Sequence, residues 1–384
     1  MRIAVVGAGF SGAVAARELA LAGYQVTVFD SRKHIGGNCH TEFDEETGIL
    51  VHRYGPHIFH TGNEEVWRYI REFGELEPFT NRVKSLSGGR VYSFPVNLHT
   101  INQFFDAAFT PAEAAAFIAS RATETGITSP QNFEQQALSM IGAELYEAFF
   151  KGYTEKQWGC SATALPASIL KRLPLRFTYD DNYYTSRYQG IPLNGYTAII
   201  KNILQIPGVK IALGATVRRA DLGAFDHVFW SGTLDGWYDY ELGSLRYRTL
   251  HFEEERSGGD FQGNPVINYP DAGVPFTRIA EHKHFSASSR DKKQTIIFRE
   301  YSRPCGFGDE PFYPLRLVDD KEILERYTNR ASSERFVTFL GRLGTYRYID
   351  MHVAIAEALD VSRRFISAIK NNERSPVFSV SPTA

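Results

Sequence analysis

Residues 1–30, MRIAVVGAGFSGAVAARELALAGYQVTVFD, combine three local patterns in the order strand, helix, strand. The β-branched apolar run Arg2–Val6 predicts a strand, and apolar residues at helical spacing over 13–20 predict a helix. Gln25–Phe29 predicts a second strand, which ends at Asp30. A glycine-rich turn between such a strand and helix, with an acidic residue after the next strand, indicates the βαβ unit of a dinucleotide-binding fold.

The turn Gly7-Ala8-Gly9-Phe10-Ser11-Gly12 explains why this opening suits a dinucleotide. Gly7 permits the tight turn, Gly9 lets the backbone approach the pyrophosphate, and Gly12 allows close helix–strand packing. The helix N-terminus then offers free N–H groups to phosphates. Asp30 accepts hydrogen bonds from ribose hydroxyls, and its charge disfavours a 2′-phosphate. The predicted cofactor contacts here are Gly7, Gly9, Phe10, Ser11, Gly12 and Asp30.

The next segment distinguishes FAD from NAD. Ser31-Arg32-Lys33-His34-Ile35-Gly36-Gly37-Asn38 resembles the glycine-doublet motif of the glutathione-reductase and amine-oxidase class of flavoproteins, and Gly341-Arg342 resembles the C-terminal flavin corner of that class. This resemblance implies FAD as the cofactor. It adds Ser31, Arg32, Gly37, Asn38 and Arg342 to the predicted FAD contacts.

Composition excludes several other kinds of partner. The 384 residues carry a formal net charge of −2, which argues against nucleic acid as a partner. The three cysteines are far apart and form no CxxC pair, so we predict no metal site and a reducing, cytoplasmic location. No uninterrupted apolar run reaches the roughly 18 residues of a membrane span.

The order of patterns along the chain predicts an α/β protein. A Rossmann-type FAD-binding domain is expected to carry an inserted helical domain and a mainly antiparallel β-sheet domain. Predicted helices cover 63–76, 101–123 (divided at Pro111), 131–150 and 349–359; we expect the polar tail after Ile369 to be disordered. The expected domains are 1–80, 196–245 and 332–384 for FAD binding, 98–165 for the helical insertion, and 81–97, 166–195 and 246–331 for the β-sheet substrate domain.

Nine further motifs point to one family. They are YGPHIFHT (54–61), NFEQQALSMIG (132–142), KGYTEKQWG (151–159), ASILKRLPLRF (167–177), DDNYY (180–184), GIPLNGYT (190–197), FTRIAEHKHF (276–285), DEPFYPL (309–315) and GRLGTYRYIDMH (341–352). These motifs resemble those of UDP-galactopyranose mutases, and the resemblance runs from residue 1 to about residue 360.

The resemblance implies a specific activity. Members interconvert UDP-galactopyranose and UDP-galactofuranose, an isomerisation with no net redox change. They require reduced FAD, whose N5 acts as the nucleophile on the anomeric carbon. A homodimer is a possible assembly.

The resemblance also implies which residues bind the substrate. Arg172 and Arg278 match the two arginines that hold the diphosphate, and the planar guanidinium suits this task because it donates paired, charge-assisted hydrogen bonds. The remaining predicted substrate contacts are Phe149, Phe150, Tyr153, Thr154, Trp158, Tyr183, Asn268, Tyr313, Tyr348 and Asp350.

Two assignments near the flavin come from the same motifs. His57 is the candidate for a group that tunes the flavin N5, with His60 as the alternative, and Arg248 is expected at the flavin. Two other functions remain open: an FAD-dependent oxidoreductase of the amine-oxidase type, and a non-catalytic UDP-sugar-binding flavoprotein.

Overall fold

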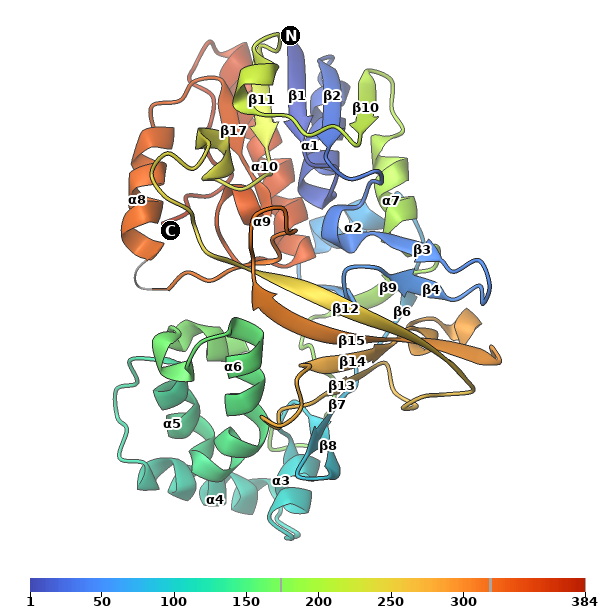
Figure 1. Ribbon diagram of the computed structural model, residues 1–384, viewed down its shortest axis with the longest axis vertical. Helices are drawn as coiled ribbons and strands as arrows, with labels where there is room; N and C mark the ends of the chain where they lie inside the picture. The colour runs from blue at the N-terminus through green and yellow to red at the C-terminus, as the bar shows by residue number, and fades with distance from the viewer. Residues whose placement is uncertain (173–174, 318–319, 384) are drawn as a thin grey trace.

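Two large β-sheets organise the chain, of which the computed structural model describes residues 1–172, 175–317 and 320–383 (Figure 1). The first sheet is parallel, with the order β10-β2-β1-β11-β17. Its strands are β1 (Arg2–Val6), β2 (Gln25–Asp30), β10 (Val209–Leu213), β11 (His227–Trp230) and β17 (Val337–Phe339). Because parallel neighbours require crossover connections, this sheet draws on the beginning, middle and end of the chain.

Helices cover both faces of the parallel sheet. On one face lie α1 (Phe10–Leu21), α7 (Gly195–Leu204) and α10 (Met351–Lys370), which share a buried apolar core with β1 and β2. On the other face lies α8 (Asp320–Ala331), through Leu324 and Tyr327. The α/β fold with a Rossmann-type domain is therefore confirmed.

The second sheet is antiparallel except where β13 pairs with β7. Its order is β16-β12-β15-β14-β13-β7-β8. The strands are β7 (Val83–Ser87), β8 (Arg90–Phe94), β12 (Tyr247–Gly258), β13 (Val266–Asn268), β14 (Arg278–Glu281), β15 (Gln294–Pro304) and β16 (Tyr313–Pro314). The strands β12 and β15 form a long twisted ribbon across the middle of the molecule (Figure 1).

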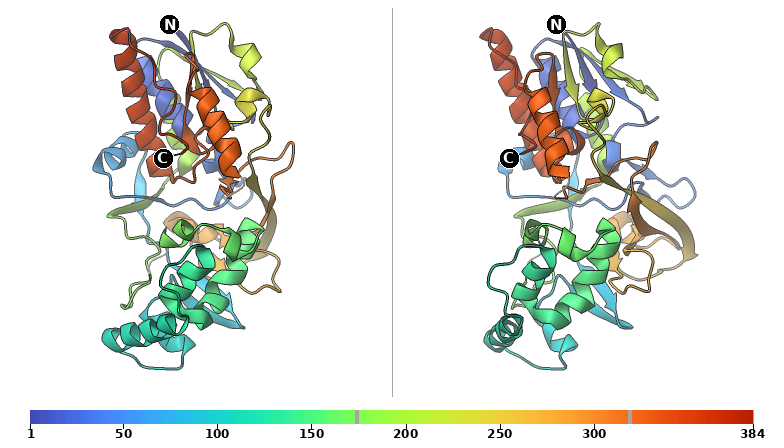
Figure 2. Two further views of the ribbon diagram at one scale, coloured as in Figure 1. Left: turned by 90° about the vertical axis from the view of Figure 1, so that its left-hand side faces the viewer. Right: turned by 60° about the vertical axis from the view of Figure 1, so that its left-hand side comes forward.

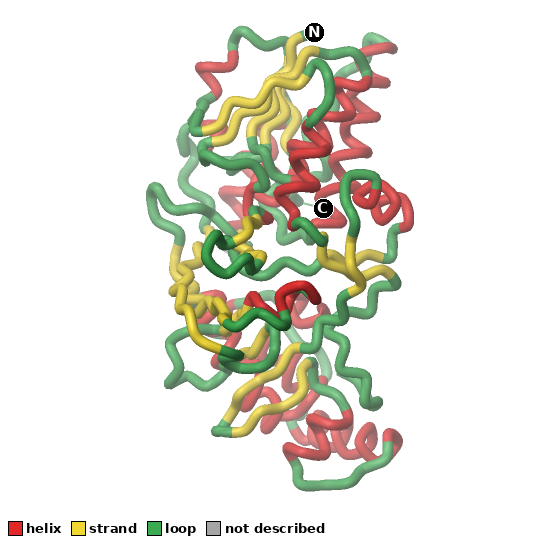
Figure 3. The backbone as a smooth tube through the Cα atoms, turned by 90° about the vertical axis from the view of Figure 1, so that its right-hand side faces the viewer, coloured by secondary structure: helices red, strands yellow, loops and turns green. Residues whose placement is uncertain are grey.

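A group of helices packs beside the second sheet. These are α3 (Leu98–Phe104), α4 (Pro111–Glu124), α5 (Phe133–Tyr146) and, after a π-helical turn over Glu147–Lys151, α6 (Gly152–Trp158). They share a core with β7 and β8. Figures 2 and 3 show these helices at the opposite end of the long axis from the parallel sheet.

Shorter elements connect the two halves. They comprise the pair β3 (Thr41–Phe43) and β4 (Leu50–His52), a three-stranded sheet of β5 (Phe59–Thr61), β9 (Tyr188–Pro192) and β6 (Leu76–Pro78), and the helices α2 (Glu64–Arg71) and α9 (Gly341–Gly344). None of the helices in the described ranges combines the length and apolar character needed to cross a bilayer.

The structure differs from the sequence-based expectation in three places. The tail after Ile369 is ordered: Phe378 pairs with Phe339 beside the end of β17, and their rings stack at 5.2 Å between centroids. The helix α8 lies on the parallel sheet instead of with the β-sheet substrate domain, because its apolar side is buried there. The strand β9 pairs with β5 and β6 from the first 80 residues. None of the three follows from local patterns, since each depends on a partner far away in the chain.

A buried histidine on β11 makes stability sensitive to acid. The ring Nε2 of His227 lies 2.9 Å from Thr338 Oγ1, and burial lowers the pKa of His227 to about 3. Below pH 6.5 the unfolded chain takes up a proton that the folded chain refuses, so the free energy of unfolding decreases as the pH falls. Between pH 6.5 and pH 4.5, we expect the free energy of unfolding of His227→Gln to fall about 2–3 kcal/mol less than that of the unchanged protein. Urea titrations at both pH values measure the free energy of unfolding. If His227→Gln loses as much of it as the exposed-site control His99→Gln, His227 is not the cause of the acid sensitivity.

Candidate active site

The corner between β1 and α1 opens into a large cavity of about 930 Å³. Gly7 has a φ of +103°, and a Cβ there would lie 2.0 Å from Ser231 Oγ. A Cβ on Gly12 would lie 1.9 Å from Gly7 O. Gly9 differs, because its backbone is extended and a Cβ would meet nothing of the protein closer than Gly37 Cα at 3.7 Å. Its missing side chain therefore leaves space on the cavity side.

Asp30 closes this corner and still faces the cavity. Its Oδ2 accepts the Ala8 N–H at 2.8 Å, and its Oδ1 accepts the Arg32 N–H at 2.9 Å. A carboxylate offers about four acceptor positions, so both oxygens retain capacity for ribose hydroxyls. The residue thus holds the glycine turn in shape and remains available to a ligand.

The glycine doublet places a buried arginine beside the corner. Arg32 donates through Nη2 to Asn38 Oδ1 at 2.7 Å and to Glu310 Oε2 at 2.5 Å, and its guanidinium stacks 4.6 Å from the Tyr54 ring centroid. Arg32, Asn38 and Glu310 all line the large cavity. The region therefore brings a fixed positive charge to the dinucleotide site.

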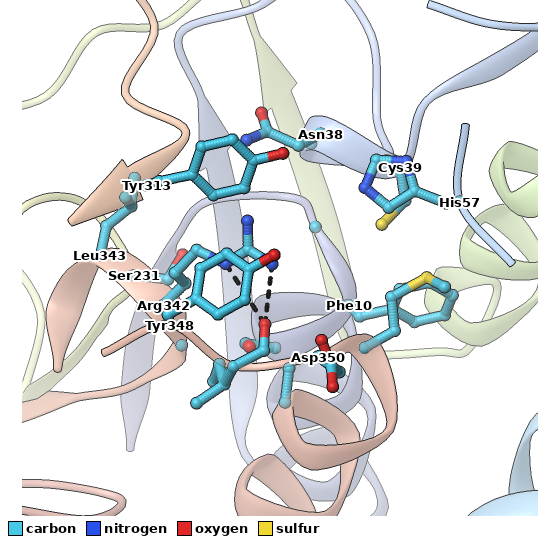
Figure 4. Close-up of a pocket in the computed structure, with 18 of the residues that line it drawn as sticks. Phe10, Asn38, Cys39, His57, Ser231, Tyr313, Arg342, Leu343, Tyr348 and Asp350 are labelled. Carbon is cyan, nitrogen blue, oxygen red and sulfur yellow. Dashed lines mark hydrogen bonds between the residues drawn. The ribbon is translucent and has the colours of Figure 1, made fainter. Parts of the chain in front are cut away.

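Arg342 joins the two halves of the site. Figure 4 shows it behind Tyr348, with hydrogen bonds to the carbonyl oxygen of Ile349, which measure 2.8 Å from Nη2 and 3.3 Å from Nε. Its Nη1 donates to Phe312 O at 3.1 Å. The guanidinium also lies 5.0 Å from the Tyr348 ring and 5.4 Å from the Tyr313 ring. These contacts orient both tyrosines toward the cavity.

A second cavity of about 790 Å³ adjoins the first. Four predicted substrate residues line only this smaller cavity: Phe149, Phe150, Thr154 and Trp158. Six others line both cavities: Tyr153, Tyr183, Asn268, Arg278, Tyr313 and Tyr348. The shared residues mark the place where the two cavities meet, which is the geometry expected for a substrate that reaches a cofactor.

Arg278 carries the partly buried charge at this junction, with its side chain 23% exposed. Its Nε and Nη2 donate to Glu300 Oε2 at 2.7 and 2.6 Å, and the Glu300 side chain is only 2% exposed. The Glu300 carboxylate, together with Tyr153 and Tyr313 nearby, holds the pKa of Arg278 well above its ordinary value despite burial. Burial raises the pKa of Tyr183 to about 12 and that of Tyr313 above its ordinary value. The arginine therefore stays charged, and the phenols keep their protons for donation.

Both candidate histidines line the large cavity. His57 Nδ1 lies 2.8 Å from Gly55 O, and burial lowers its pKa to about 4. Because a carbonyl only accepts, Nδ1 carries the proton of the neutral ring and Nε2 presents a lone pair. His60 stacks on Tyr184 at 3.8 Å, and burial lowers its pKa to about 4. The distinction between the two stays a prediction.

The predictions for Arg172 and Arg248 have different outcomes. The side chain of Arg172 lies outside the described residues. Arg248 lines neither cavity: its Nε donates to Gln157 O at 3.2 Å and to Ser302 Oγ at 3.0 Å. Its guanidinium is turned to the C-terminal end of α6, and its contact with the flavin stays a prediction.

The structure adds cavity residues that the motifs did not single out. Besides Glu310, they include Ser231 after β11, the segment 215–217 after β10, and Gln157 on α6. The first two follow strands of the parallel sheet, and carboxyl ends of parallel strands share one edge. That rule finds them once β10 and β11 are known to belong to this sheet. Gln157 follows Tyr153 by one helical turn, so it lies on the side of α6 that lines the smaller cavity.

Comparison with known proteins assigns the chain to a family. Residues 148–348 match the model of UDP-galactopyranose mutase. A protein of Klebsiella pneumoniae named probable UDP-galactopyranose mutase is 51% identical over 378 residues, which is 98% of this chain and 98% of that protein. The chain belongs to the UDP-galactopyranose mutase family.

Further matches name a second sugar nucleotide and show the fold. A protein of Escherichia coli named dTDP-fucopyranose mutase is 48% identical, over 97% of this chain and 99% of its own. Residues 5–73 match a model for NAD(P)-binding Rossmann-like domains. The crystal structure of a reduced UDP-galactopyranose mutase has the same fold, with a TM-score of 0.75 at 15% identity over 97% of this chain and 96% of that one. The cofactor of this mutase-family protein is FAD.

The space beside Gly9 gives a test of how the mutase-family chain holds FAD. We expect Gly9→Val to lose most of its bound FAD, because the extended backbone tolerates valine while the new side chain occupies the cavity. Flavin absorbance per protein after gel filtration measures this, with thermal unfolding as the check on folding. Gly223→Val is the matched control, since Gly223 has a φ of −62° and no neighbour within 4 Å of a Cβ. Full retention in Gly9→Val would contradict the placement of the pyrophosphate.

Proposed function

We propose that the protein interconverts UDP-galactopyranose and UDP-galactofuranose, with no net redox change. Reduced FAD would supply the nucleophile, its N5, for the anomeric carbon. The observation that carries this proposal is the junction of the two cavities, where six predicted substrate residues, Arg278 among them, line both the FAD-side and the aromatic cavity. Such a junction suits a nucleotide sugar whose nucleoside lies in one cavity and whose sugar reaches the other.

The smaller cavity has the character of a nucleoside site. The π-helical turn and α6 supply four of its aromatic side chains, and Trp158 lies 6.5 Å from the Tyr313 ring and 6.3 Å from the Tyr348 ring. Flat rings of this kind can stack on a pyrimidine base. Thr154 adds a buried hydroxyl to the same wall. We infer that the base and ribose bind here.

The junction suits the diphosphate. The ion pair with Glu300 holds the guanidinium of Arg278 in place before any ligand arrives, and a prepositioned charge stabilises negative charge that develops on a leaving group. Tyr313 and Tyr348, whose ring centroids are 5.3 Å apart, add phenol hydroxyls. We propose Arg172 as the second diphosphate contact, on the basis of its motif alone. His57, neutral at physiological pH, is proposed beside the flavin.

The sugar nucleotide has a second candidate. The 48% identical relative named dTDP-fucopyranose mutase covers nearly the whole chain, so a thymidine nucleotide and a 6-deoxy sugar are also compatible with membership of the family. The amine-oxidase type of chemistry is disfavoured, because the family match covers residues 148–348, where the predicted substrate side chains lie.

Product analysis distinguishes these possibilities. The FAD-bound protein, reduced with dithionite, is incubated separately with UDP-galactofuranose and with dTDP-fucopyranose, and products are separated by chromatography. We expect conversion of UDP-galactofuranose to UDP-galactopyranose, only with reduced flavin and without stoichiometric consumption of reductant. Turnover of the dTDP sugar alone would replace the substrate assignment. Stoichiometric oxidation of the reductant during turnover, or no turnover of either sugar, would contradict the mutase proposal.

The arginine proposal has its own test. We expect Arg278→Ala and Arg172→Ala each to lower turnover by about 10²–10³-fold, the typical effect of removing one group that stabilises developing charge. Arg278→Lys and Arg172→Lys should keep only part of the turnover, because a point charge does not reproduce the planar guanidinium. Turnover of UDP-galactofuranose at saturating substrate is measured beside FAD content, which we expect to stay constant.

Two controls separate this effect from a loss of stability. Arg256→Ala removes an exposed arginine of β12 that lines neither cavity and pairs with Asp44. It should leave turnover unchanged. Because Arg278→Ala leaves the buried Glu300 unpaired, the double variant Arg278→Met/Glu300→Gln removes both charges and tests turnover in a neutral site. Near-normal turnover of the Ala variants would rule out the diphosphate role.

A further inference from the structure

Lys156 on α6 has an unusual set of partners. Its ammonium nitrogen lies 2.5, 3.0, 2.9 and 3.1 Å from four backbone carbonyl oxygens, those of Tyr269, Asp271, Val274 and Phe276. An ammonium has three hydrogens to donate, so the four acceptors surround it and share them. Burial lowers the pKa of Lys156 to about 8, with the Asp271 charge acting against this shift, so the group is charged at neutral pH.

The four carbonyls belong to one loop. Residues 269–277 connect β13, which ends at Asn268, to β14, which begins at Arg278. Asn268 and Arg278 face each other in the β13–β14 pairing, and both line the two cavities. A single side chain of α6 therefore holds the turn between two residues at the junction of the cavities.

A second contact lies one helical turn earlier. A Cβ on Gly152 would lie 2.2 Å from Pro270 O and 3.5 Å from Ala272 N, so the helix backbone rests directly on the same loop. The other end of α6 is held too, because Ser302 Oγ donates to Gln157 O at 2.6 Å and Arg248 Nε donates to the same oxygen at 3.2 Å. The helix is thus attached to β12, to β15 and to the β13–β14 loop.

The same helix carries one wall of the smaller cavity. Tyr153, Thr154, Gln157 and Trp158 of α6 line it. Lys156 stands between these residues in sequence but points the other way, into the loop. Its contacts set where the aromatic wall lies relative to Arg278.

We propose that Lys156 is a positioning residue, which fixes the spacing between the nucleoside wall on α6 and the cavity junction at Asn268 and Arg278, where Arg278 is the proposed diphosphate contact. This proposal rests on the proposed function, because it requires that a nucleoside diphosphate spans the two. A ligand that touches only one side is insensitive to this spacing. A ligand that must contact both sides at once loses affinity when the spacing is no longer held.

The test compares two ligands on the FAD-bound protein. Lys156→Met keeps the length of the side chain and removes the charge and its donors. We expect the Kd of UDP, measured by isothermal titration calorimetry, to rise about 10-fold or more, while the Kd of uridine changes less than about 3-fold. The KM for the nucleotide sugar should rise with the Kd of UDP, and FAD content should stay constant. Equal weakening of UDP and uridine, or no weakening of UDP, would overturn the proposal.

Matched variants keep the outcome interpretable. Lys151→Met removes a half-exposed lysine of the preceding turn that pairs with Glu147 at 2.8 Å, and both Kd values should stay unchanged. Gly152→Ala retains Lys156 and favours the helix by propensity, yet its methyl group pushes the loop away, so it should weaken UDP selectively even if Lys156→Met folds poorly. Lys156→Arg should bind UDP almost as weakly as Lys156→Met, since a planar guanidinium does not fit four converging oxygens.

The two proposals fail in different ways. A wild-type protein that binds UDP and turns over the sugar, with variants that bind UDP equally well, would overturn the positioning role alone. A wild-type protein that binds neither UDP nor dTDP would overturn the proposed function, and the positioning role with it.

Discussion

Close backbone approach around the first turn of α1 is the constraint on which the rest of the structure depends. A Cβ on Gly12 would lie 1.9 Å from Gly7 O, and one on Gly7 would lie 2.0 Å from Ser231 Oγ. A Cβ on Gly341 would lie 3.0 Å from Ser11 Oγ. These segments follow β1, β11 and β17, so three distant parts of the chain meet at one edge of the parallel sheet. Side chains other than glycine would force them apart and close the surface that receives the dinucleotide.

The second half of the site depends on a buried charge. Burying an arginine and a glutamate costs desolvation energy that their attraction does not always recover, so the Arg278–Glu300 pair is weak evidence for stability. Its value lies in orientation: Glu300 fixes the guanidinium at the junction of the cavities before a ligand binds. The attachment of α6 to the β13–β14 loop through Lys156 sets the other wall at a defined place. Charge and aromatic wall are thus prepared together.

Family membership leaves the choice of sugar nucleotide open. Relatives at 51% and 48% identity are named for a UDP-sugar and a dTDP-sugar. Both sugar nucleotides contain a diphosphate, so the protein groups suited to FAD and to a diphosphate serve either one. Discrimination between uracil and thymine, or between galactose and its 6-deoxy form, concerns single methyl and hydroxyl groups. On the proposed binding mode, we expect a few side chains of the smaller cavity to distinguish the bases and side chains of the larger cavity to distinguish the sugars.

The sequence by itself determined the βαβ opening and the roles of Gly7, Gly9 and Gly12, because each depends on residues close together in the chain. The presence of FAD followed from the resemblance of residues 31–38 and 341–342 to flavoprotein motifs. The family resemblance also predicted six side chains that line both cavities. Only the tertiary structure decided which distant residues become partners. It turned Arg248 away from the cavities, placed α8 on the parallel sheet, ordered the tail beside β17, and enclosed Lys156 in four carbonyl oxygens. Local periodicity reports which side of an element is apolar, whereas partnership depends on the order of strands and on packing between elements that the pattern does not contain.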